Sequence, residues 1–314
     1  MLLASFALAA LAVALAWPVP ILLAAARWPD RAPGTALVVW QSIALAGGLS
    51  MIGAMLTFGL VPFGDDLVHG LQGFLARLVG GTLPNGAQFV QTFALSGAIL
   101  LGVHLLLSLV TTFAKTQRLR RRHRQLVTLL SDPMPERPHT RLIDHAAPVA
   151  YCLPGTTRSV TVLSAGLIGL LDEEQLRAVI AHETAHASQR HYLVLLSFRA
   201  WRGALSWFPI ATRAHEAVAM LVEMLADDQA RRQVPDATLV RSIALVATEL
   251  VDSQPAPALE SPLAASGPTA SRRIARLTDP RGPLPAAARA LAIACAVALI
   301  AVPTVLLVTP AFAG

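Results

Sequence analysis

Charged side chains are scarce in this chain. Asp, Glu, Lys and Arg make up only 14% of its 314 residues, whereas 54% are hydrophobic. Soluble globular proteins carry about 25% charged residues. This shortage, together with a mean hydropathy of +0.57, argues against an ordinary soluble protein and favours one that lies in a membrane.

Cysteines are rare as well, because Cys152 and Cys295 are the only two. They lie in regions that we predict to occupy different environments, the first in a polar segment and the second in an apolar one. No disulfide framework is therefore expected, and a reducing compartment is permitted for the polar segment.

The net charge of +6 does not indicate nucleic-acid binding, because the positive charge is concentrated in one place. Six basic residues fall within residues 115–124 (KTQRLRRRHR), directly after a long apolar run. A basic block beside a membrane span is typical of orientation signals and of contact with anionic lipid. We therefore expect membrane lipid as a partner and no direct binding of nucleic acid.

Four stretches are long and apolar enough to cross a bilayer, which takes about 20 residues in a helix. They are residues 2–26, 36–62, 89–114 and 286–309. The first has no positive residue before its apolar run, so we expect an uncleaved span rather than a signal peptide. No inverted repeat of the kind found in transporters is evident.

The flanking charges predict how these spans are oriented. The segment after the first span carries Arg27 and Arg31, and the basic block follows the third, whereas the loop over residues 63–88 begins with Asp65 and Asp66. Positive segments stay in the cytoplasm. We therefore predict a multi-pass protein of the plasma membrane with both termini outside.

This topology predicts three parts. Residues 1–114 form a membrane domain with three spans, and residues 115–285 form a cytoplasmic domain. Residues 286–314 form the fourth span and a short extracellular tail. Small residues in the second span, Gly47, Gly48 and Gly53, would permit close helix packing in a homodimer.

The predicted extracellular loop, residues 63–88, contains an amphipathic stretch. Five apolar residues share one helical face: Leu67, Leu71, Phe74, Leu75 and Leu78. They predict a short helix lying in the membrane interface. His69 beside Asp65 and Asp66 could bind a metal or sense pH, but a solvated polar face is the commoner outcome for such residues.

The cytoplasmic segment contains the sequence AHETAH, in which His182, Glu183 and His186 form a His-Glu-x-x-His motif. Histidines four residues apart meet on one face of a helix, where they can bind zinc, with the glutamate beside them as general base. Catalytic zinc takes three protein ligands and leaves a fourth position for water. A third ligand is therefore expected on a neighbouring helix.

The segment HEAVAMLVEMLADDQARR supplies that ligand. We assign Glu223 as the third ligand, and Asp227, four residues later, as the carboxylate that orients a ligating imidazole. Pro209 breaks the connection between the two helices, which would pack antiparallel. The site would hold one Zn²⁺ per chain, and Glu183 would take a proton from water and deliver it to the leaving amine.

A short strand and a helix cap precede the motif. Ser159–Leu163 has the pattern of a strand, followed by a predicted turn at Ala165–Gly166, and Asp172 is suited to cap the motif helix. The strand could pair with an extended substrate. Nearby His191, His215 and Tyr192 are more typical of structural or solvated residues, and His104 in the third span of a packed or snorkelling one.

Three segments carry a resemblance to a known family: CLPG at residues 152–155, LSAGLIGLLDEEQLRAVIAHETAH at 163–186 and EMLAD at 223–227. Together with the order of the spans, they make the whole chain resemble the BlaR/MecR-type membrane metallopeptidases. The resemblance implies a gluzincin-like fold with the ligands and base named above. It also implies that a cytoplasmic transcriptional repressor or antirepressor is cleaved in a signalling pathway.

One departure from that family is large. Members that sense β-lactams carry an extracellular penicillin-binding domain after the fourth span, whereas here the sequence PAFAG follows it. Acylation by β-lactams is therefore not expected, and the inducing signal stays open.

A second resemblance competes with the first. HtpX-like and CAAX-prenyl membrane proteases share the zinc helix and the Glu-x-x-Ala-Asp pattern, and ASRRIARL at residues 270–277 resembles their later Arg-Ile motif. Their preceding His-Pro is Gly267–Pro268 here. Arg273 is therefore a candidate for the rim of the active site and, with His215, for stabilising the transition state.

The sequence thus predicts a mainly α, integral membrane protein. Four transmembrane helices carry a mostly helical zinc-peptidase domain with a small sheet between the third and fourth spans. Its leading predicted function is cleavage of a cytoplasmic repressor, and the first alternative is HtpX-like quality control of membrane proteins. From another class, a zinc-stabilised receptor or scaffold that cuts nothing is the remaining alternative, although such a site has no need of Glu183.

Overall fold

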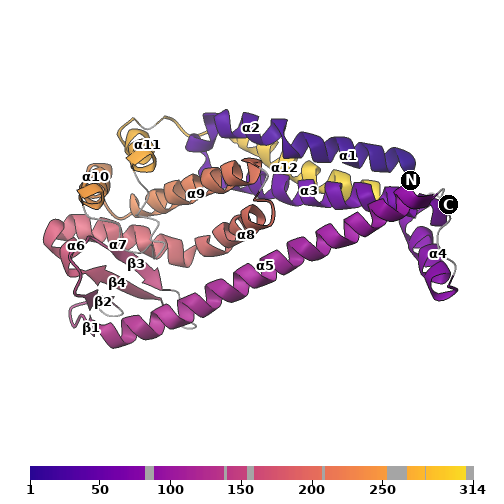
Figure 1. Cartoon of the computed structure of the whole chain (residues 1–314). Coiled ribbons are helices and arrows are strands. Elements are labelled where there is room, and N and C mark those ends of the chain that lie inside the picture. Colours follow the sequence, from indigo (N-terminus) through magenta and orange to yellow (C-terminus); the bar gives the residue numbers. More distant parts are fainter. Residues whose placement is uncertain are drawn as a thin grey trace.

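The computed structural model describes residues 1–81, 88–137, 140–153, 159–206, 209–252, 267–279 and 281–308. Parts of three predicted features lie outside these residues: 82–87 of the predicted extracellular loop, 154–155 of CLPG and the tail over 309–314. The described chain is mostly helical and carries one small sheet (Figure 1).

The helices are α1 (Leu2–Ala16), α2 (Pro18–Ala25), α3 (Pro33–Leu60), α4 (Leu67–Val79), α5 (Phe89–Leu130), α6 (Ala165–Leu170), α7 (Glu173–Ser188), α8 (His191–Ala204), α9 (Pro209–Ala230), α10 (Asp236–Asp252), α11 (Gly267–Thr278) and α12 (Ala286–Val308). Two short 3-10 helices are η1 (Trp28–Arg31) and η2 (Val61–Phe63). The strands are β1 (Ser131–Pro133), β2 (Thr140–Ile143), β3 (Ala150–Leu153) and β4 (Val160–Ser164).

Four helical segments are long and apolar enough to cross a membrane, at the four predicted places. They are Leu2–Ala25, Pro33–Phe63, Phe89–Leu130 and Ala286–Val308. Large apolar side chains stay exposed on them, including Leu3 (85% exposed) and Leu100 (72% exposed). Such surfaces are compatible with a membrane protein, because lipid can cover them.

The first of these segments is broken in the middle. Trp17 leaves the helical region (φ −129°, ψ −74°), which divides α1 from α2. The cause is Pro18, which starts α2: proline has no N–H for the helix ladder and disfavours helical backbone at the residue before it.

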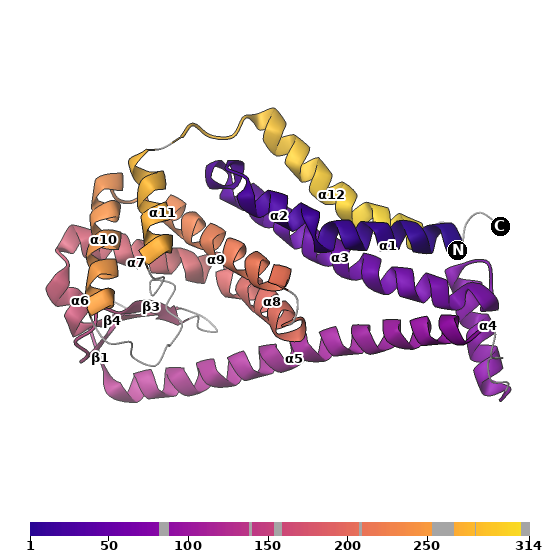
Figure 2. The same cartoon turned by 45° about the horizontal axis from the view of Figure 1, so that its top comes forward.

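The third segment, in contrast, is continuous. α5 has 42 residues, so the third span and the basic block after it form one helix about 63 Å long. This is about twice the thickness of the hydrocarbon core of a bilayer. One end of α5 therefore lies beside α3 and α4, and the other ends at the sheet (Figure 2).

The sheet has the strand order β1-β2-β4-β3. β4 pairs in parallel with β2 and antiparallel with β3, so it lies inside the sheet, and β3 is an edge strand. The predicted strand is thus confirmed with a shift of one residue. The turn predicted at Ala165–Gly166 is wrong, because the Ser164 side chain accepts a hydrogen bond from the Leu167 N–H and caps α6 there.

Helices α8 and α9 form a hairpin that fills the space between the diverging α3 and α5 (Figure 2). Side chains of α5 hold it in place: Ser108 donates a hydrogen bond to the Ala200 carbonyl (2.9 Å), and His104 Nε2 lies 3.1 Å from the Ala204 carbonyl. His104 thus contacts the α8–α9 hairpin. The hairpin also shares a hydrophobic core with α1, α2 and α3, whose buried residues are Leu15, Leu23, Ala36, Trp40, Ile43, Ala46, Phe198, Ala214, Val218, Leu221 and Val222.

The glycines of the second span pack mainly within the chain. A Cβ at Gly53 would lie 3.0 Å from Leu307 of α12, and one at Gly47 would lie 3.6 Å from Leu15 of α1. A Cβ at Gly48 would meet nothing within 4 Å. Two of the three small residues therefore serve the contacts of α3 with its neighbouring spans.

The predicted amphipathic helix is present as α4. Asp66 caps it by accepting hydrogen bonds from the Val68 and His69 N–H groups, both at 2.8 Å, and its second oxygen pairs with the His69 ring. Apolar side chains such as Leu71 (46% exposed) and Leu78 (62% exposed) stay uncovered. Asp66 therefore has a structural role as a helix cap.

The short helix η1, which lies between the first two candidate spans, forms an ion pair and hydrogen bonds with α11. Arg272 pairs with Asp30 at 2.6 Å, and Arg276 donates to the Asp30 carbonyl at 2.7 Å. Arg276 also pairs with Asp228 on α9 at 2.8 Å. These contacts join the turn between the first two candidate spans to helices α9 and α11.

Candidate metal centre

The motif helix α7 begins as predicted. The Asp172 side chain accepts a hydrogen bond from the Gln175 N–H, and the Gln175 side chain accepts one from the Asp172 N–H. This reciprocal capping box satisfies two backbone donors that a helix start leaves unpaired. It fixes the register of α7 and so directs His182, Glu183 and His186 to its buried face.

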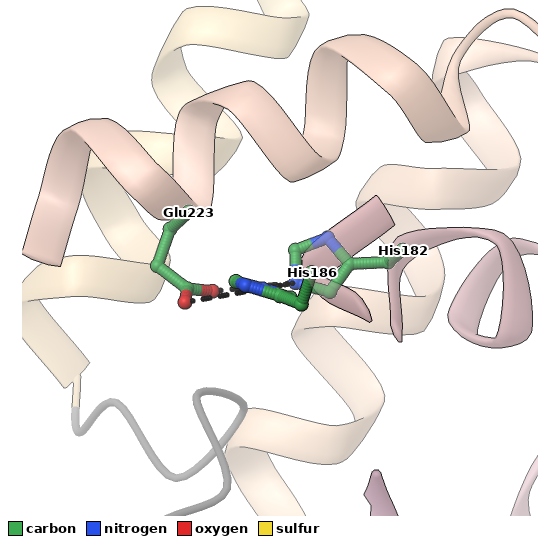
Figure 3. A group of neighbouring side chains, drawn as sticks. All are labelled: His182, His186 and Glu223. Carbon is green, nitrogen blue, oxygen red and sulfur yellow. Dashed lines mark hydrogen bonds and ion pairs between the residues drawn. The ribbon is translucent and has the colours of Figure 1, made fainter. Parts of the chain in front are cut away.

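Three side chains from α7 and α9 point toward one another at the centre of the candidate site (Figure 3). The Nε2 atoms of His182 and His186 are 3.1 Å apart. Glu223 places Oε2 at 3.3 Å from the first of these atoms and Oε1 at 3.4 Å from the second. The two helices run antiparallel, as predicted, because His182 contacts Asp227 whereas His186, later on α7, contacts Glu223, earlier on α9.

These separations are close to those expected around a bound metal ion. With metal–ligand bonds of about 2.0–2.2 Å, neighbouring ligand atoms of a tetrahedral site lie roughly 3.3–3.6 Å apart. In addition, the buried oxygen Glu183 Oε1 accepts no hydrogen bond from the described residues. The group of His182, His186 and Glu223 could therefore bind a metal ion.

Asp227 and Arg273 lie directly behind the two histidines. Asp227 Oδ1 is 2.9 Å from Nδ1 of His182, where it accepts the ring proton. Arg273 donates to both oxygens of Asp227, at 2.8 and 2.6 Å, and its Nη1 lies 3.1 Å from Glu223 Oε2. The side chain of Arg273 is only 2% exposed, so its expected place at the rim is wrong.

The charges of this cluster favour different states for the two imidazoles. Burial lowers the pKa of His186, so its ring is neutral and has a lone pair to offer. Burial also acts to lower the pKa of His182, but the hydrogen bonds of Asp227 and Glu223 raise it to about 9. His182 must therefore lose a proton before it can bind a metal, which makes the metal affinity rise with pH.

Glu183 lies beside the group and is 1% exposed. The backbone N–H of Cys152 on β3 donates a hydrogen bond to its carboxylate. Burial raises the pKa of Glu183 to about 8, and the nearby charge of Glu223 adds to the rise. A carboxylate with such a pKa can take up and release a proton near neutral pH.

The strand expected to pair with a substrate is not available for that role. β4 has hydrogen-bonded neighbours on both sides, β2 and β3, so its backbone groups are already used. β3 is the strand at the edge of the sheet, and Cys152 on it touches Glu183. Sequence reasoning missed β3 because a four-residue strand has no pattern that reveals its neighbours.

The remaining predicted residues lie in different surroundings. His215 is eight positions before Glu223 on α9, which is about 12 Å along a helix. Tyr192 stacks under the Arg120 guanidinium at 4.0 Å. His191, expected to be structural or solvated, is buried against His186, and burial lowers its pKa to about 4.

One of three comparisons with known proteins found a match, and this match agrees with the geometry of the site. Searches of curated proteins and of solved structures each gave no significant match. Residues 114–227, however, match the model of peptidase family M48. The matched part runs from the end of the apolar half of α5 to Asp227 and so contains the three residues that could hold a metal.

This match supports a metallopeptidase of the M48 family, and it gives no specific support to the BlaR/MecR subtype. Peptidases of this family are generally metal-dependent, in agreement with the group formed by His182, His186 and Glu223. The match therefore indicates that the chain is a peptidase, a hydrolase acting on peptide bonds.

Proposed function

We propose that this chain is a membrane-bound zinc endopeptidase. His182, His186 and Glu223 would hold the zinc, and Glu183 would be its general base and acid. The observation that carries this proposal is that His182, His186 and Glu223 each place a ligand atom within 4.8 Å of the others, beside the buried oxygen Glu183 Oε1, which accepts no hydrogen bond from the described residues. Two imidazoles and one carboxylate suit zinc well among the divalent metals.

When bound, zinc polarises a scissile carbonyl and lowers the pKa of water to about 7. The residues of the chain supply the rest. Glu183 removes a proton from the attacking water and hands it to the nitrogen of the leaving amine. Asp227 holds the Nδ1 proton of His182, which keeps Nε2 free for the metal. Arg273 holds the carboxylates of Asp227 and Glu223 in position through its ion pairs with them.

The substrate would bind as an extended segment along β3. An edge strand presents unpaired backbone donors and acceptors, to which another chain can add as a further strand. Cys152 of β3 is hydrogen-bonded to Glu183, so a chain that pairs with β3 passes next to the proposed base.

The proposed substrate is a cytoplasmic protein, as the sequence predicts, and a transcriptional repressor is the first candidate. Its support is the positive-inside rule, which puts residues 115–285 in the cytoplasm of a plasma-membrane protein with both termini outside. Quality control of membrane proteins is the second candidate. It is favoured by the place of Arg273, because the Arg-Ile segment that resembles HtpX-like proteases reaches the metal ligands.

The test uses the full-length protein in detergent, as wild type and as Glu183→Gln. Bound zinc is quantified in both, and fragments of the chain, of a candidate repressor and of a misfolded membrane protein are followed by mass spectrometry. We expect about one zinc per chain in both proteins and cleavage by the wild type alone. Zinc in both without cleavage of any substrate would favour a receptor or scaffold that cuts nothing.

A further inference from the structure

His191 makes contacts that its sequence position does not explain. It is the first residue of α8 and is 3% exposed. Its Nδ1 lies 3.0 Å from Nδ1 of His186, and its Nε2 lies 2.9 Å from Oε1 of Gln189. His191 therefore connects the back of one proposed ligand to a side-chain amide on the surface.

The proton positions along this chain of contacts follow from the acceptor at its end. An amide oxygen only accepts hydrogen bonds, so Nε2 of His191 carries a proton and donates it to Gln189. In a neutral ring the other nitrogen, Nδ1, is then an acceptor. His186 must donate to it from its own Nδ1, which leaves Nε2 of His186 unprotonated on the side of His182 and Glu223.

We propose that His191, with Gln189, is the positioning residue that fixes the tautomer and the ring orientation of His186 for metal binding. The inference rests on the proposed zinc site. With His191 in this role, each of the two ligating histidines has its own acceptor for the Nδ1 proton, since Asp227 accepts that of His182 in the same way. Such hydrogen-bond partners fix the orientation of a ligating imidazole ring and strengthen its bond to the metal.

The backbone between α7 and α8 supports this assignment. Arg190 has φ 51° and ψ 36°, and it is the one residue other than glycine with a positive φ among those that the structure describes. Left-handed backbone is unfavourable for a side chain of this size. Here it makes the tight turn that brings His191 back over His186, five residues earlier.

The first test measures the zinc affinity of the full-length protein in detergent by competition with a chelator. His191→Leu keeps the volume but removes the acceptor, and we expect it to weaken zinc binding by about 10–100-fold. His191→Asn, whose amide oxygen can accept from Nδ1 of His186, should recover most of this loss. Leu196→Ala, at a buried position farther along α8, is the control for a purely structural effect and should leave the affinity unchanged.

A second pair of variants tests the tautomer of His191 by substitutions at exposed positions, which disturb the fold less than a change in the interior. Gln189→Lys replaces the acceptor with a donor and so favours the wrong tautomer of His191. Ser188→Lys adds the same charge at a neighbouring exposed position. We expect weaker zinc binding and an altered visible spectrum of the cobalt-loaded protein in the first variant only.

Three outcomes would overturn parts of this account. Unchanged affinity in both His191→Leu and Gln189→Lys would overturn the positioning role. Equal losses in His191→Leu and Leu196→Ala would reduce His191 to a packing residue. Absence of zinc from the wild type would instead overturn the proposed function, together with the inference that depends on it.

Discussion

Arg273 and Asp227, 46 positions apart in the sequence, form a two-point ion pair in the interior of the protein, with N–O distances of 2.8 and 2.6 Å. Both side chains are almost completely buried, at 2% and 1% exposed. Asp227 also accepts the Nδ1 proton of His182. A single carboxylate thus connects α11 to the candidate metal centre on α7 and α9.

The first prediction concerns Asp227→Asn. This change removes one of the two carboxylates that neutralise the buried Arg273 and leaves Glu223 as the other. The loss of one member of a buried pair costs up to about 3–5 kcal/mol of stability. The thermal midpoint of unfolding in detergent should fall by several degrees. Asp228→Asn is the matched control: its ion pair with Arg276 is partly exposed and is worth about 0–1 kcal/mol. Equal effects of the two substitutions would contradict the prediction.

The second prediction is the acid dependence of this pair. Burial alone would raise the pKa of Asp227, but Arg273 and His182 hold it far below its ordinary value. The unfolded chain therefore binds this proton more readily, so the stabilisation is full above about pH 5 and is lost progressively as the pH falls further. In zinc-free protein, the gap in thermal midpoint between wild type and Asp227→Asn should narrow between pH 5 and about pH 3. A difference in thermal midpoint that stays constant over this pH range would contradict the prediction.

The third prediction is the pH dependence of cleavage. Glu183 must be ionised to act as a base, and burial raises its pKa to about 8 in the metal-free site. A bound divalent cation lowers the pKa of a neighbouring carboxyl. The rise of kcat/KM with pH should therefore have its midpoint below 8 and above the ordinary glutamate value of about 4.3. A midpoint outside this window would exclude Glu183 as the titrating base.

The fourth prediction concerns the junction of β4 and α6. A Cβ on Gly166 would overlap with the Ala146 carbonyl oxygen, so Gly166→Ala must displace the backbone. We expect a clear drop in thermal midpoint. Gly169→Ala on the same helix meets nothing within 4 Å and should be neutral or slightly stabilising, since alanine is the better helix former.

Local patterns predicted much of the candidate site. The four-residue spacing of His182 and His186, and that of Glu223 and Asp227, are properties of single helices, so the sequence was enough to place each pair on one face. The cap at Asp172 is equally local. Apolar length alone located the four candidate spans.

Features that depend on distant partners could not be predicted in this way. β3 became the edge strand because β2 inserts on the other side of β4, a pairing that four-residue strands do not reveal. Arg273 was expected at the rim because ASRRIARL resembles the Arg-Ile motif, and an arginine is rarely buried without a partner. Its partners, Asp227 and Glu223, lie on α9, and only the packing of α11 shows that they neutralise it.

The shared core of the α8–α9 hairpin and helices α1, α2 and α3 has a consequence for breakage of the chain. Phe198 and Val218 of the hairpin are buried in the same cluster as Trp40 of α3. A protease that cut between α5 and the sheet would therefore leave α7, α8 and α9 attached to the first three candidate spans by packing alone, with only α12 still joined to them through the chain. A nicked protein should stay assembled in detergent, whereas residues 115–285 expressed alone would expose this apolar surface and aggregate.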